Sequence, residues 1–481
     1  MCRQTATFDP RRHDAAETSE AQSRTTSPVA ASSTGTLDQL ADYLTDGYWT
    51  DSGDSPMAFD TSASNEITVD LTGLTAAGKQ LARWALQAWE LVADLQFTEV
   101  TSRADMIFDD SDRNTAYAYS DLLGDTITTS YVNVGTGWIS TYGTEIDSYS
   151  FTTYVHEIGH ALGLGHQGDY NGNASYGYDE TFSNDSWQLS VMSYFSQWDN
   201  TTVDATEAYP VSAMMADIIA IQNLYGAPGA SSNSAGNTTW GANTNLTGYY
   251  EDLFDGISGG DGNGNLAGVD VAFTVYDRDG TDTFDFRPNA NDNRLDLNDE
   301  SASDMFGAIG NLLIARDTVI ENALMGRGDD TVTGNDANNL LKGGGGSDSL
   351  WGDDGRDKLF GQGGHDALLG QEGNDVLKGN GGRDTLDGGA GNDVLTGGAQ
   401  SDVFVFDIGY DIDRILDFTL GGDWLALGTG LTGGNTEASS VLATYGRLTS
   451  YGALLRFDTE TKLKINGITD LDALTDDIFF V

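Results

Sequence analysis

The chain lacks three features that would place it in common classes of protein. It has one cysteine, Cys2, in 481 residues, so no disulfide can form within it and stability must come from the core or from metal. No apolar run is long enough to span a bilayer. Only 23 basic residues oppose 74 acidic ones. The resulting net charge of −51 argues against nucleic acid and anionic membranes as partners.

The first part of the chain also lacks order signals. Residues 1–35 are polar, rich in Ser, Thr and Ala, and without periodicity, so they predict a flexible leader. They contain no apolar segment of the kind found in secretory signal peptides. After them, apolar spacing predicts helices over 75–95, 150–164 and 214–225, with Thr75 as the N-cap of the first. Short strand-like runs lie between these helices.

Acidic residues and 61 glycines combine in a repeat in the second half of the chain. From Met325 to Val405 the sequence divides into nine units of nine residues. Glycine opens every unit but the first, and an apolar residue fills the eighth position of all nine. Aspartate fills the sixth position of every unit except one, where Asn339 stands: Asp330, Asp348, Asp357, Asp366, Asp375, Asp384, Asp393 and Asp402.

This period predicts a parallel spiral in which two units make one turn. The glycine half of each unit is a turn, and the other half is a short strand whose apolar side chain points inward. Equivalent residues then stack eighteen positions apart, so Asp348 lies between Asp330 and Asp366. Carboxylates stacked at strand spacing, about 4.7 Å, repel unless a cation lies between them. Calcium, a hard cation that takes oxygen ligands, fits such a site.

A second pattern, His156-Glu157-x-x-His160-x-x-Gly163-x-x-His166, lies in the predicted helix 150–164. His156 and His160 project from one face of a helix and can reach one zinc ion at about 2.0–2.1 Å. Gly163 breaks the helix so that the chain turns back with His166. Three neutral nitrogens leave positions open for water and substrate, and Glu157 is placed to accept a proton from that water.

Two further residues fit the same site. Met192, in Ser190-Val191-Met192-Ser193-Tyr194, predicts a tight turn whose thioether packs beneath the histidines. Tyr194 can bring its phenol to zinc as an extra ligand. It can also swing away and donate a hydrogen bond to the tetrahedral intermediate.

Together these residues resemble the serralysins, bacterial metzincin proteases with a calcium-loaded β-roll. The resemblance runs through Tyr154–His166, Gly168–Asn171, the Met192 turn, Asp217–Gly226 and Asp282–Phe286 into the repeats. It implies a zinc endopeptidase of broad specificity whose extended substrate pairs with an edge strand, which we place at Ser130–Val134. It also implies a calcium site at Asp277 and Asp282.

The resemblance carries expectations about partners and location as well. It implies protein or peptide substrates, a proteinaceous inhibitor, removal of a short leader, and export to the outside of the cell by a type I secretion channel that reads the C-terminus. The segment 477–481, an acidic residue before an apolar end, looks like that signal. The chain departs from the family at Gln167, where proline is usual. Because that position is expected to line the site, substrate preference is expected to differ.

The sequence therefore predicts an α+β metzincin protease domain followed by an all-β parallel β-roll, in a monomer. We assign a leader to 1–35, the zinc domain to 36–228, a linker and first calcium site to 229–324, the repeats to 325–405 and a C-terminal β-region to 406–481.

Two alternatives remain. The first is a calcium-dependent adhesin or matrix protein with a relic protease domain. The second is a nucleophile elbow at Gly256-Ile257-Ser258-Gly259-Gly260, which requires a strand before it and a helix after it.

Overall fold

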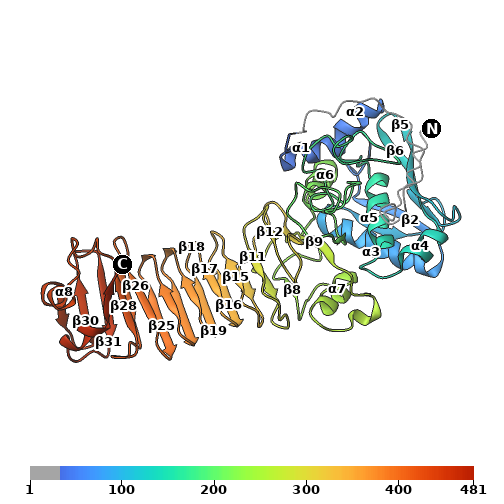
Figure 1. Cartoon of the computed structure of the whole chain (residues 1–481). Helices are drawn as coiled ribbons and strands as arrows, with labels where there is room; N and C mark the ends of the chain where they lie inside the picture. Colours follow the sequence, from blue (N-terminus) through green and yellow to red (C-terminus); the bar gives the residue numbers. More distant parts are fainter. Residues whose placement is uncertain (1–32) are drawn as a thin grey trace.

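The computed structural model describes residues 33–481, so Cys2 and residues 1–32 of the predicted leader lie outside the described residues. A rounded part with helices and a mixed sheet carries a long, narrow stack of strands that extends away from it (Figure 1). This arrangement confirms the predicted fold class, an α+β domain followed by a parallel β-roll. Within residues 33–481, no helix combines the length and apolarity needed to cross a membrane.

A six-stranded sheet forms one wall of the rounded part, in the order β1-β6-β4-β2-β3 with β5 paired to the outer side of β6. Only β5 is antiparallel to its neighbour. The strands are β1 (Ala58–Phe59), β2 (Glu66–Gly73), β3 (Gln96–Glu99), β4 (Met106–Asp109), β5 (Ala116–Leu123) and β6 (Thr126–Val134).

Two long helices pack together next to this sheet and fill the core. α3 (Ala76–Val92) begins at Thr75, whose hydroxyl accepts the N–H of Gly78, as predicted. Its apolar face is fully buried, with Trp89 0% exposed, and it packs on α5 (Tyr149–Ala161). α5 is buried on nearly every side, so it lies in the interior of this part of the molecule.

Shorter helices surround this pair. The chain enters the fold through α1 (Leu37–Asp42), a π-helical turn η2 (Tyr43–Gly47) and α2 (Tyr48–Ser52). The other helices of this part are α4 (Thr136–Tyr142), α6 (Met215–Tyr225) and α7 (Tyr249–Ile257). The Gly-x-Ser-x-Gly segment begins inside the last turn of α7, with Ser258 as its C-cap. No strand directly precedes Ser258, so the segment does not form a nucleophile elbow.

The roll consists mainly of two facing parallel sheets. One runs through β8 (Thr239–Gly241), β10 (Thr283–Asp285), β14 (Asn322–Leu324), β16 (Leu340–Gly345), β19 (Lys358–Gly363), β22 (Val376–Gly381), β25 (Val394–Ala399), β27 (Ile412–Ile415), β31 (Lys462–Asn466), β30 (Gly452–Arg456) and β29 (Gly446–Leu448). The other runs through β11 (Arg294–Asp296), β15 (Thr331–Thr333), β17 (Ser349–Trp351), β20 (Ala367–Leu369), β23 (Thr385–Asp387), β26 (Val403–Phe406), β28 (Trp424–Leu427) and β32 (Ile478–Phe480).

The remaining elements join the two parts or edge the roll. They are β7 (Tyr209–Pro210), β9 (Val271–Val275), β12 (Ala302–Ser303), β13 (Leu312–Ile314), β18 (Asp354–Gly355), β21 (Glu372–Gly373), β24 (Ala390–Gly391), α8 (Ala438–Tyr445) and the 3₁₀ turns η3 (Gly262–Gly264) and η4 (Asp472–Asp477).

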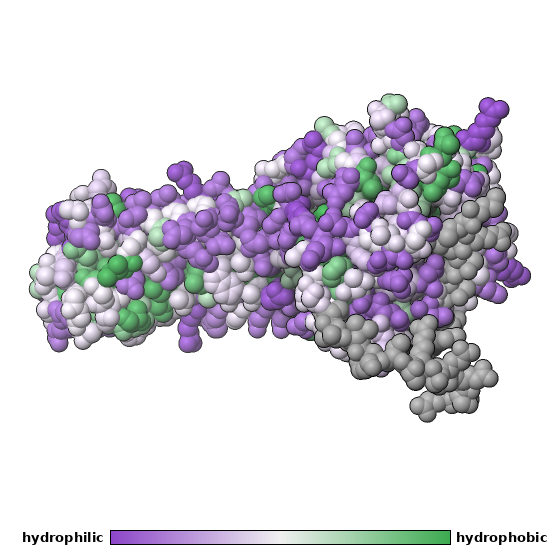
Figure 2. Space-filling view, turned by 90° about the horizontal axis from the view of Figure 1, so that it is seen from above, coloured by the Kyte–Doolittle hydropathy of each residue, from purple (hydrophilic) through white to green (hydrophobic). Residues whose placement is uncertain are grey.

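The register of the roll matches the nine-residue period. Val332 pairs with Leu350 and Leu341 pairs with Leu359, each eighteen residues further on. All nine apolar residues at the eighth position are 0% exposed, so they form the central core of the roll. Most of the visible surface along the roll is hydrophilic, and hydrophobic side chains gather near the end that carries the C-terminal strands (Figure 2).

Candidate metal centre and carboxylate ladder

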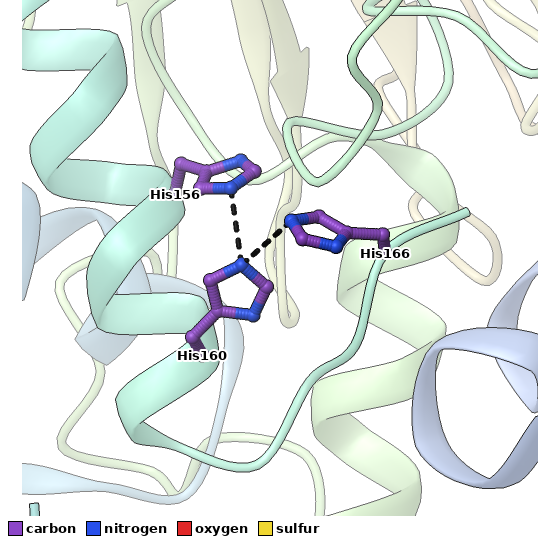
Figure 3. A group of neighbouring side chains, drawn as sticks. All are labelled: His156, His160 and His166. Carbon is purple, nitrogen blue, oxygen red and sulfur yellow. Dashed lines mark hydrogen bonds between the residues drawn. The ribbon is translucent and has the colours of Figure 1, made fainter. Parts of the chain in front are cut away.

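Three histidines converge in the rounded part. His156 and His160 come from α5, and His166 comes from the segment that follows it (Figure 3). The Nε2 atoms of His156 and His160 are 3.1 Å apart, and those of His160 and His166 are 2.9 Å apart. They form the one group of three or more His, Cys, Asp or Glu side chains within residues 33–481 whose ligand atoms lie close enough to hold a metal.

Backbone carbonyls fix the protonation of two of these rings. The Nδ1 of His156 is 2.8 Å from the carbonyl of Val191, and the Nδ1 of His160 is 2.8 Å from that of Leu164. Because a carbonyl only accepts, each Nδ1 carries the proton and each Nε2 presents a lone pair. Lone pairs that converge in this way form a binding site for a cation, and the imidazole donor set fits zinc.

Burial keeps the histidines neutral, as metal ligands must be. It lowers the pKa of His156 to about 4 and that of His160 to about 3. Burial also lowers the pKa of His166 well below its usual value. At neutral pH all three rings are therefore uncharged and can each offer a nitrogen lone pair to a metal ion.

The end of α5 delivers the third histidine. The helix stops at Ala161, and Gly163 has a φ of +106°, which L-residues with a side chain rarely adopt. A Cβ at this position would lie 2.1 Å from the carbonyl oxygen of Met57, so there is no space for one. The turn that the sequence predicted at Gly163 is confirmed.

Glu157 lies beside the histidines without a competing partner. Its side chain is 3% exposed, and its Oε2 has no hydrogen-bond partner among the described residues. It lines a small cavity of about 30 Å³ together with His156 and Tyr194. Burial raises the pKa of Glu157 to about 8, whereas a neighbouring metal cation favours the ionised form.

The turn around Met192 packs against the same helix. Met192 is 0% exposed, and a Cβ on Gly159 would lie 2.6 Å from its sulfur. Asp217 of α6 holds this turn: its carboxylate accepts the hydroxyl of Ser190 at 2.6 Å and the N–H of Val191 at 2.7 Å. The carbonyl of Val191 accepts the hydrogen bond from Nδ1 of His156, so Asp217 indirectly orients the ring of His156. Sequence reasoning assigned it no role; its signal is an acid in the first turn of an apolar helix.

Tyr194 packs against the histidines. Its ring centre is 4.5 Å from that of His166, and its phenol oxygen accepts the N–H of Gly172 at 3.4 Å. Burial raises the pKa of Tyr194 well above its usual range, so the phenol is protonated and can donate. Its backbone N–H meets the hydroxyl of Tyr170, which donates to Asp185 at 2.9 Å. Neither Tyr170 nor Asp185 was predicted to support the site.

The edge strand of the sheet is not the one that the sequence predicted. Ser130–Val134 belongs to β6, which pairs with β4 on one side and with β5 on the other. The free edge is β5, which reaches β6 through a tight hairpin at Gly124. Ala118 and Ser120 of β5 line a groove of about 490 Å³ that also contains His160.

The expectation that Gln167 lines the site is wrong as well. Its side chain is 0% exposed, and its Nε2 donates to the carbonyl of Leu40 in α1 at 3.2 Å. The side chain thus points toward the N-terminal helix, away from both the cavity and the groove.

The aspartates of the roll form a hydrogen-bonded ladder. The N–H of Asp348 donates to Oδ1 of Asp366 at 2.9 Å, and the same bond recurs between successive turns in both stacks. The second oxygen has no hydrogen-bond partner within residues 33–481 in any of the eight repeat aspartates. It lies against the glycine that opens the unit: a Cβ on Gly343 would lie 2.1 Å from Oδ2 of Asp348.

These carboxyls are buried without a compensating charge. The eight repeat aspartates are at most 2% exposed. Burial raises the pKa of Asp348 and of Asp357 to about 7, and the neighbouring aspartates of the ladder add to the effect. Oxygen atoms without partners, from carboxyls that resist ionisation, are a donor set that fits calcium.

Asp277 and Asp282 form a similar pair before the repeat. They are 3% and 1% exposed, and the N–H of Asp282 donates to Glu321 at 2.7 Å. Burial, together with the adjacent Asp277, raises the pKa of Asp282 to about 8. Asp277 accepts the indole N–H of Trp240 at 2.8 Å. Glu321 is a neighbour that the sequence did not suggest.

The ladder extends beyond the nine units at both ends. Asn293 donates its N–H to Asp330 at 2.9 Å, and the N–H groups of Asp393 and Asp402 donate to Asp413 and Asp423 at 2.9 and 3.0 Å. These last steps span 20 and 21 residues instead of 18, so a search for a strict nine-residue period misses them.

The fold and the site together define a class of protein. A histidine triad on a buried helix next to a glutamate, joined to a parallel roll lined with aspartates, is typical of a metzincin domain followed by a calcium-type β-roll.

Comparisons with known proteins narrow this class. The family description "Peptidase M10 serralysin C terminal" matches residues 263–468, and "Peptidase M66" matches residues 100–192. Metallopeptidase AprA of Pseudomonas marginalis is 36% identical over 60% of this chain and 61% of the relative. Serralysin of Photorhabdus luminescens is 36% identical over 55% and 54%, and serralysin C of Dickeya chrysanthemi is 38% identical over 53% and 53%.

The chain is therefore similar to serralysins over its C-terminal half and over a little more than half of each of these relatives. It spans between 53% and 61% of the length of these three curated relatives.

Proposed function

We propose that the protein is a secreted zinc endopeptidase that hydrolyses peptide bonds in proteins with broad specificity. The observation that carries the proposal is the convergence of three neutral imidazole nitrogens next to the buried carboxylate of Glu157. Zinc bound by His156, His160 and His166 supplies a Lewis acid that lowers the pKa of water and polarises the scissile carbonyl.

Glu157 is the general base in this proposal. Its carboxylate accepts a proton from the attacking water and passes it to the nitrogen of the leaving amine, so that the water adds OH to the carbonyl carbon and H to the nitrogen. The absence of a partner for Oε2 among the described residues supports this role, because no other donor competes for the oxygen that must take the proton.

Tyr194 has two roles in the proposal. Its phenol would be an extra ligand for bound zinc, and it would also donate a hydrogen bond to the oxygen of the tetrahedral intermediate. The packing of Tyr194 on the ring of His166 supports the first role, and its protonated phenol supports the second.

The substrate is an extended stretch of protein or peptide that pairs with the edge of β5. Main-chain pairing is tolerant of sequence, which accounts for broad specificity. The groove of about 490 Å³ beside β5 and His160 supports this placement.

Calcium stabilises the roll in this proposal. It is held by the ladder aspartates and by the pair before the repeat: Asp277, Asp282, Asp330, Asp348, Asp357, Asp366, Asp375, Asp384, Asp393 and Asp402. Their buried oxygens and raised pKa values support a cation as the missing partner.

Export and inhibition are the parts of the proposal that rest on the family resemblance. A type I secretion channel reads the C-terminal segment 477–481, which contains β32, and a proteinaceous inhibitor blocks the cleft. Calcium is plentiful outside the cell and scarce within, so the roll folds after export.

The test is hydrolysis of casein by the wild type and by Glu157→Gln, with zinc content measured in both. Removal of a general base is expected to lower activity about 10²- to 10⁴-fold while zinc stays bound. Glu99→Gln, which changes an exposed carboxylate in β3, is the matched control and should keep full activity. Activity close to that of the wild type in Glu157→Gln would contradict the mechanism.

The same assay distinguishes the endopeptidase from the alternative, a calcium-dependent adhesin with a relic protease domain. A relic is free to lose its base, so the presence of a buried Glu157 favours an enzyme. A wild-type chain that binds zinc and calcium but cleaves nothing in a zinc-sensitive manner would favour the adhesin.

A further inference from the structure

The N-terminal segment contacts the loop that carries the third histidine. We call residues 33–52 the N-terminal strap and residues 163–167 the metal loop. The N–H of Gly165 donates to the carbonyl of Leu44 at 2.7 Å. The indole N–H of Trp49 donates to the carbonyl of Gly163 at 2.9 Å. The side chain of Gln167 donates to the carbonyl of Leu40 at 3.2 Å. The strap is thus hydrogen-bonded to every second residue of the metal loop, at positions 163, 165 and 167.

Ring packing joins the same two segments. The ring of Tyr48 lies edge-on to that of His166, with centres 5.1 Å apart and an interplanar angle of 87°. A Cβ on Gly165 would lie 2.3 Å from the Tyr48 side chain. The strap therefore bears directly on the ring that is proposed to ligate zinc.

The beginning of the strap holds a second loop of the site. The N–H of Gly35 donates to Oδ1 of Asn184 at 2.9 Å, and Nδ2 of Asn184 donates back to the carbonyl of Gly35 at 2.9 Å. The N–H of Ser183 donates to the carbonyl of Ser33 at 3.2 Å. The next residue, Asp185, holds Tyr170 beside His166 and Tyr194.

The third histidine needs such support more than the other two. His156 and His160 are fixed by the hydrogen bonds of α5, but the helix ends at Ala161. Beyond it, a ligand on a loop loses conformational freedom when it binds metal, unless neighbouring structure has already ordered the loop. The strap contributes to that order through the bonds above, in addition to the bonds that join Leu164 to Gly159 and His160 of α5.

We infer that the N-terminal strap positions His166 for metal binding and that Gln167 is its positioning residue. The inference depends on one part of the proposed function, the binding of zinc by the three histidines.

The environment of Gln167 supports a role in bonding rather than in packing. The side chain is 0% exposed, and its Oε1 has no hydrogen-bond partner among the described residues. A buried amide with one unpaired end is unfavourable, so an apolar side chain would fill this space better. What the amide adds is the bond from the metal loop to Leu40.

The test uses the full chain with cobalt(II) in place of zinc. Gln167→Met keeps the size of the side chain and removes the donor. Substitution of groups that orient metal ligands typically costs 10- to 100-fold in metal affinity, so cobalt and zinc should leave the variant about 10- to 100-fold faster in the presence of a chelator. The visible absorption bands of bound cobalt should also change, because the third imidazole is less well fixed.

The matched control is Gln222→Met. Gln222 donates the same kind of bond, from Nε2 to the carbonyl of Val92 at 2.9 Å, but away from the metal loop. Trp49→Phe, which removes the donor to Gly163, is a second variant and decides the question if Gln167→Met does not fold.

Each outcome is decisive. Wild-type spectra and release rates in both strap variants would overturn the inference. So would equal losses in the strap variants and in Gln222→Met, because the effect would then be one of general stability. A wild-type chain that binds no cobalt at the triad would overturn the proposed function itself. Faster release in the strap variants alone would support the strap.

Discussion

The two proposed metal-binding regions of this molecule are built on opposite principles. The zinc site takes uncharged nitrogens from eleven consecutive residues, His156 to His166. The roll takes carboxyl groups from residues mostly eighteen apart, so each step of the ladder joins different turns of the spiral. One site is local and neutral, and the other is distributed and charged.

This difference determines what happens without metal. Neutral imidazoles repel one another weakly, so a buried helix and the loop that follows it can hold them in place before zinc arrives. Buried carboxylates stacked along a roll must be protonated or neutralised by a cation. The catalytic domain is therefore expected to be preorganised for its metal, whereas the roll is expected to form with its metal.

The largest effect on the folding of the roll is expected when ladder aspartates are replaced by uncharged asparagines. The nine units already contain one amide at the sixth position, Asn339, whose backbone N–H donates to Asp357 at 2.8 Å. The double variant Asp366→Asn with Asp384→Asn removes two charges from one stack. At pH 8 without calcium it should keep more β-structure than the wild type by circular dichroism. Its calcium midpoint should rise about tenfold, since charge sets calcium affinity.

Its control removes the same charge from the surface of the roll. Asp336→Asn with Asp354→Asn changes two exposed aspartates and should leave the calcium midpoint near that of the wild type. Equal shifts in the two double variants would mean that net charge, not the ladder, couples calcium to folding.

Tyr194→Phe tests the catalytic side of the comparison. Loss of a hydrogen bond made only in the transition state should lower kcat about 10²-fold with little change in KM. Tyr178→Phe, at a side chain that is 59% exposed, is the control. A rise in KM at constant kcat would show instead that Tyr194 acts in substrate binding.

The smallest expected effect is the pH dependence of the calcium-free roll. The pKa of Asp348 is raised from its usual 3.8 to about 7, so the folded roll binds more protons than the unfolded chain between these values. Stability from this group is complete below about pH 4 and is lost as the pH rises through about 7. Urea unfolding at pH 5 and 8 in a chelator should show the higher midpoint at pH 5.

Calcium should reverse this trend, because it competes with protons for the same oxygens. A calcium-free roll that is more stable at pH 8 than at pH 5 would contradict the raised pKa values.

The sequence predicts best where the pattern is short or periodic. The register of the roll follows from the nine-residue period, and the turn at Gly163 follows from the need for a residue without a Cβ. The position of Met192 against α5 was also predictable, because the turn lies a short distance after the triad.

It predicts less where distant segments meet. Gln167 bonds to Leu40, 127 residues away, and no local pattern indicates that contact. The edge strand was misplaced because β5 and β6 form a hairpin in which β5 lies outside β6. The apolar pattern of the two strands does not indicate which of them lies at the edge of the sheet. Asp413 and Asp423 were missed because their spacing departs from the period.

The most direct test of the contrast between the two regions is hydrogen exchange on the full chain, read separately for α5 and for the strands β15 to β26. Zinc and calcium are removed one at a time with selective chelators. We predict that zinc removal leaves the protection of α5 nearly unchanged, and that calcium removal abolishes protection in the strands of the roll. Full protection of the roll without calcium, or loss of protection in α5 without zinc, would contradict the account.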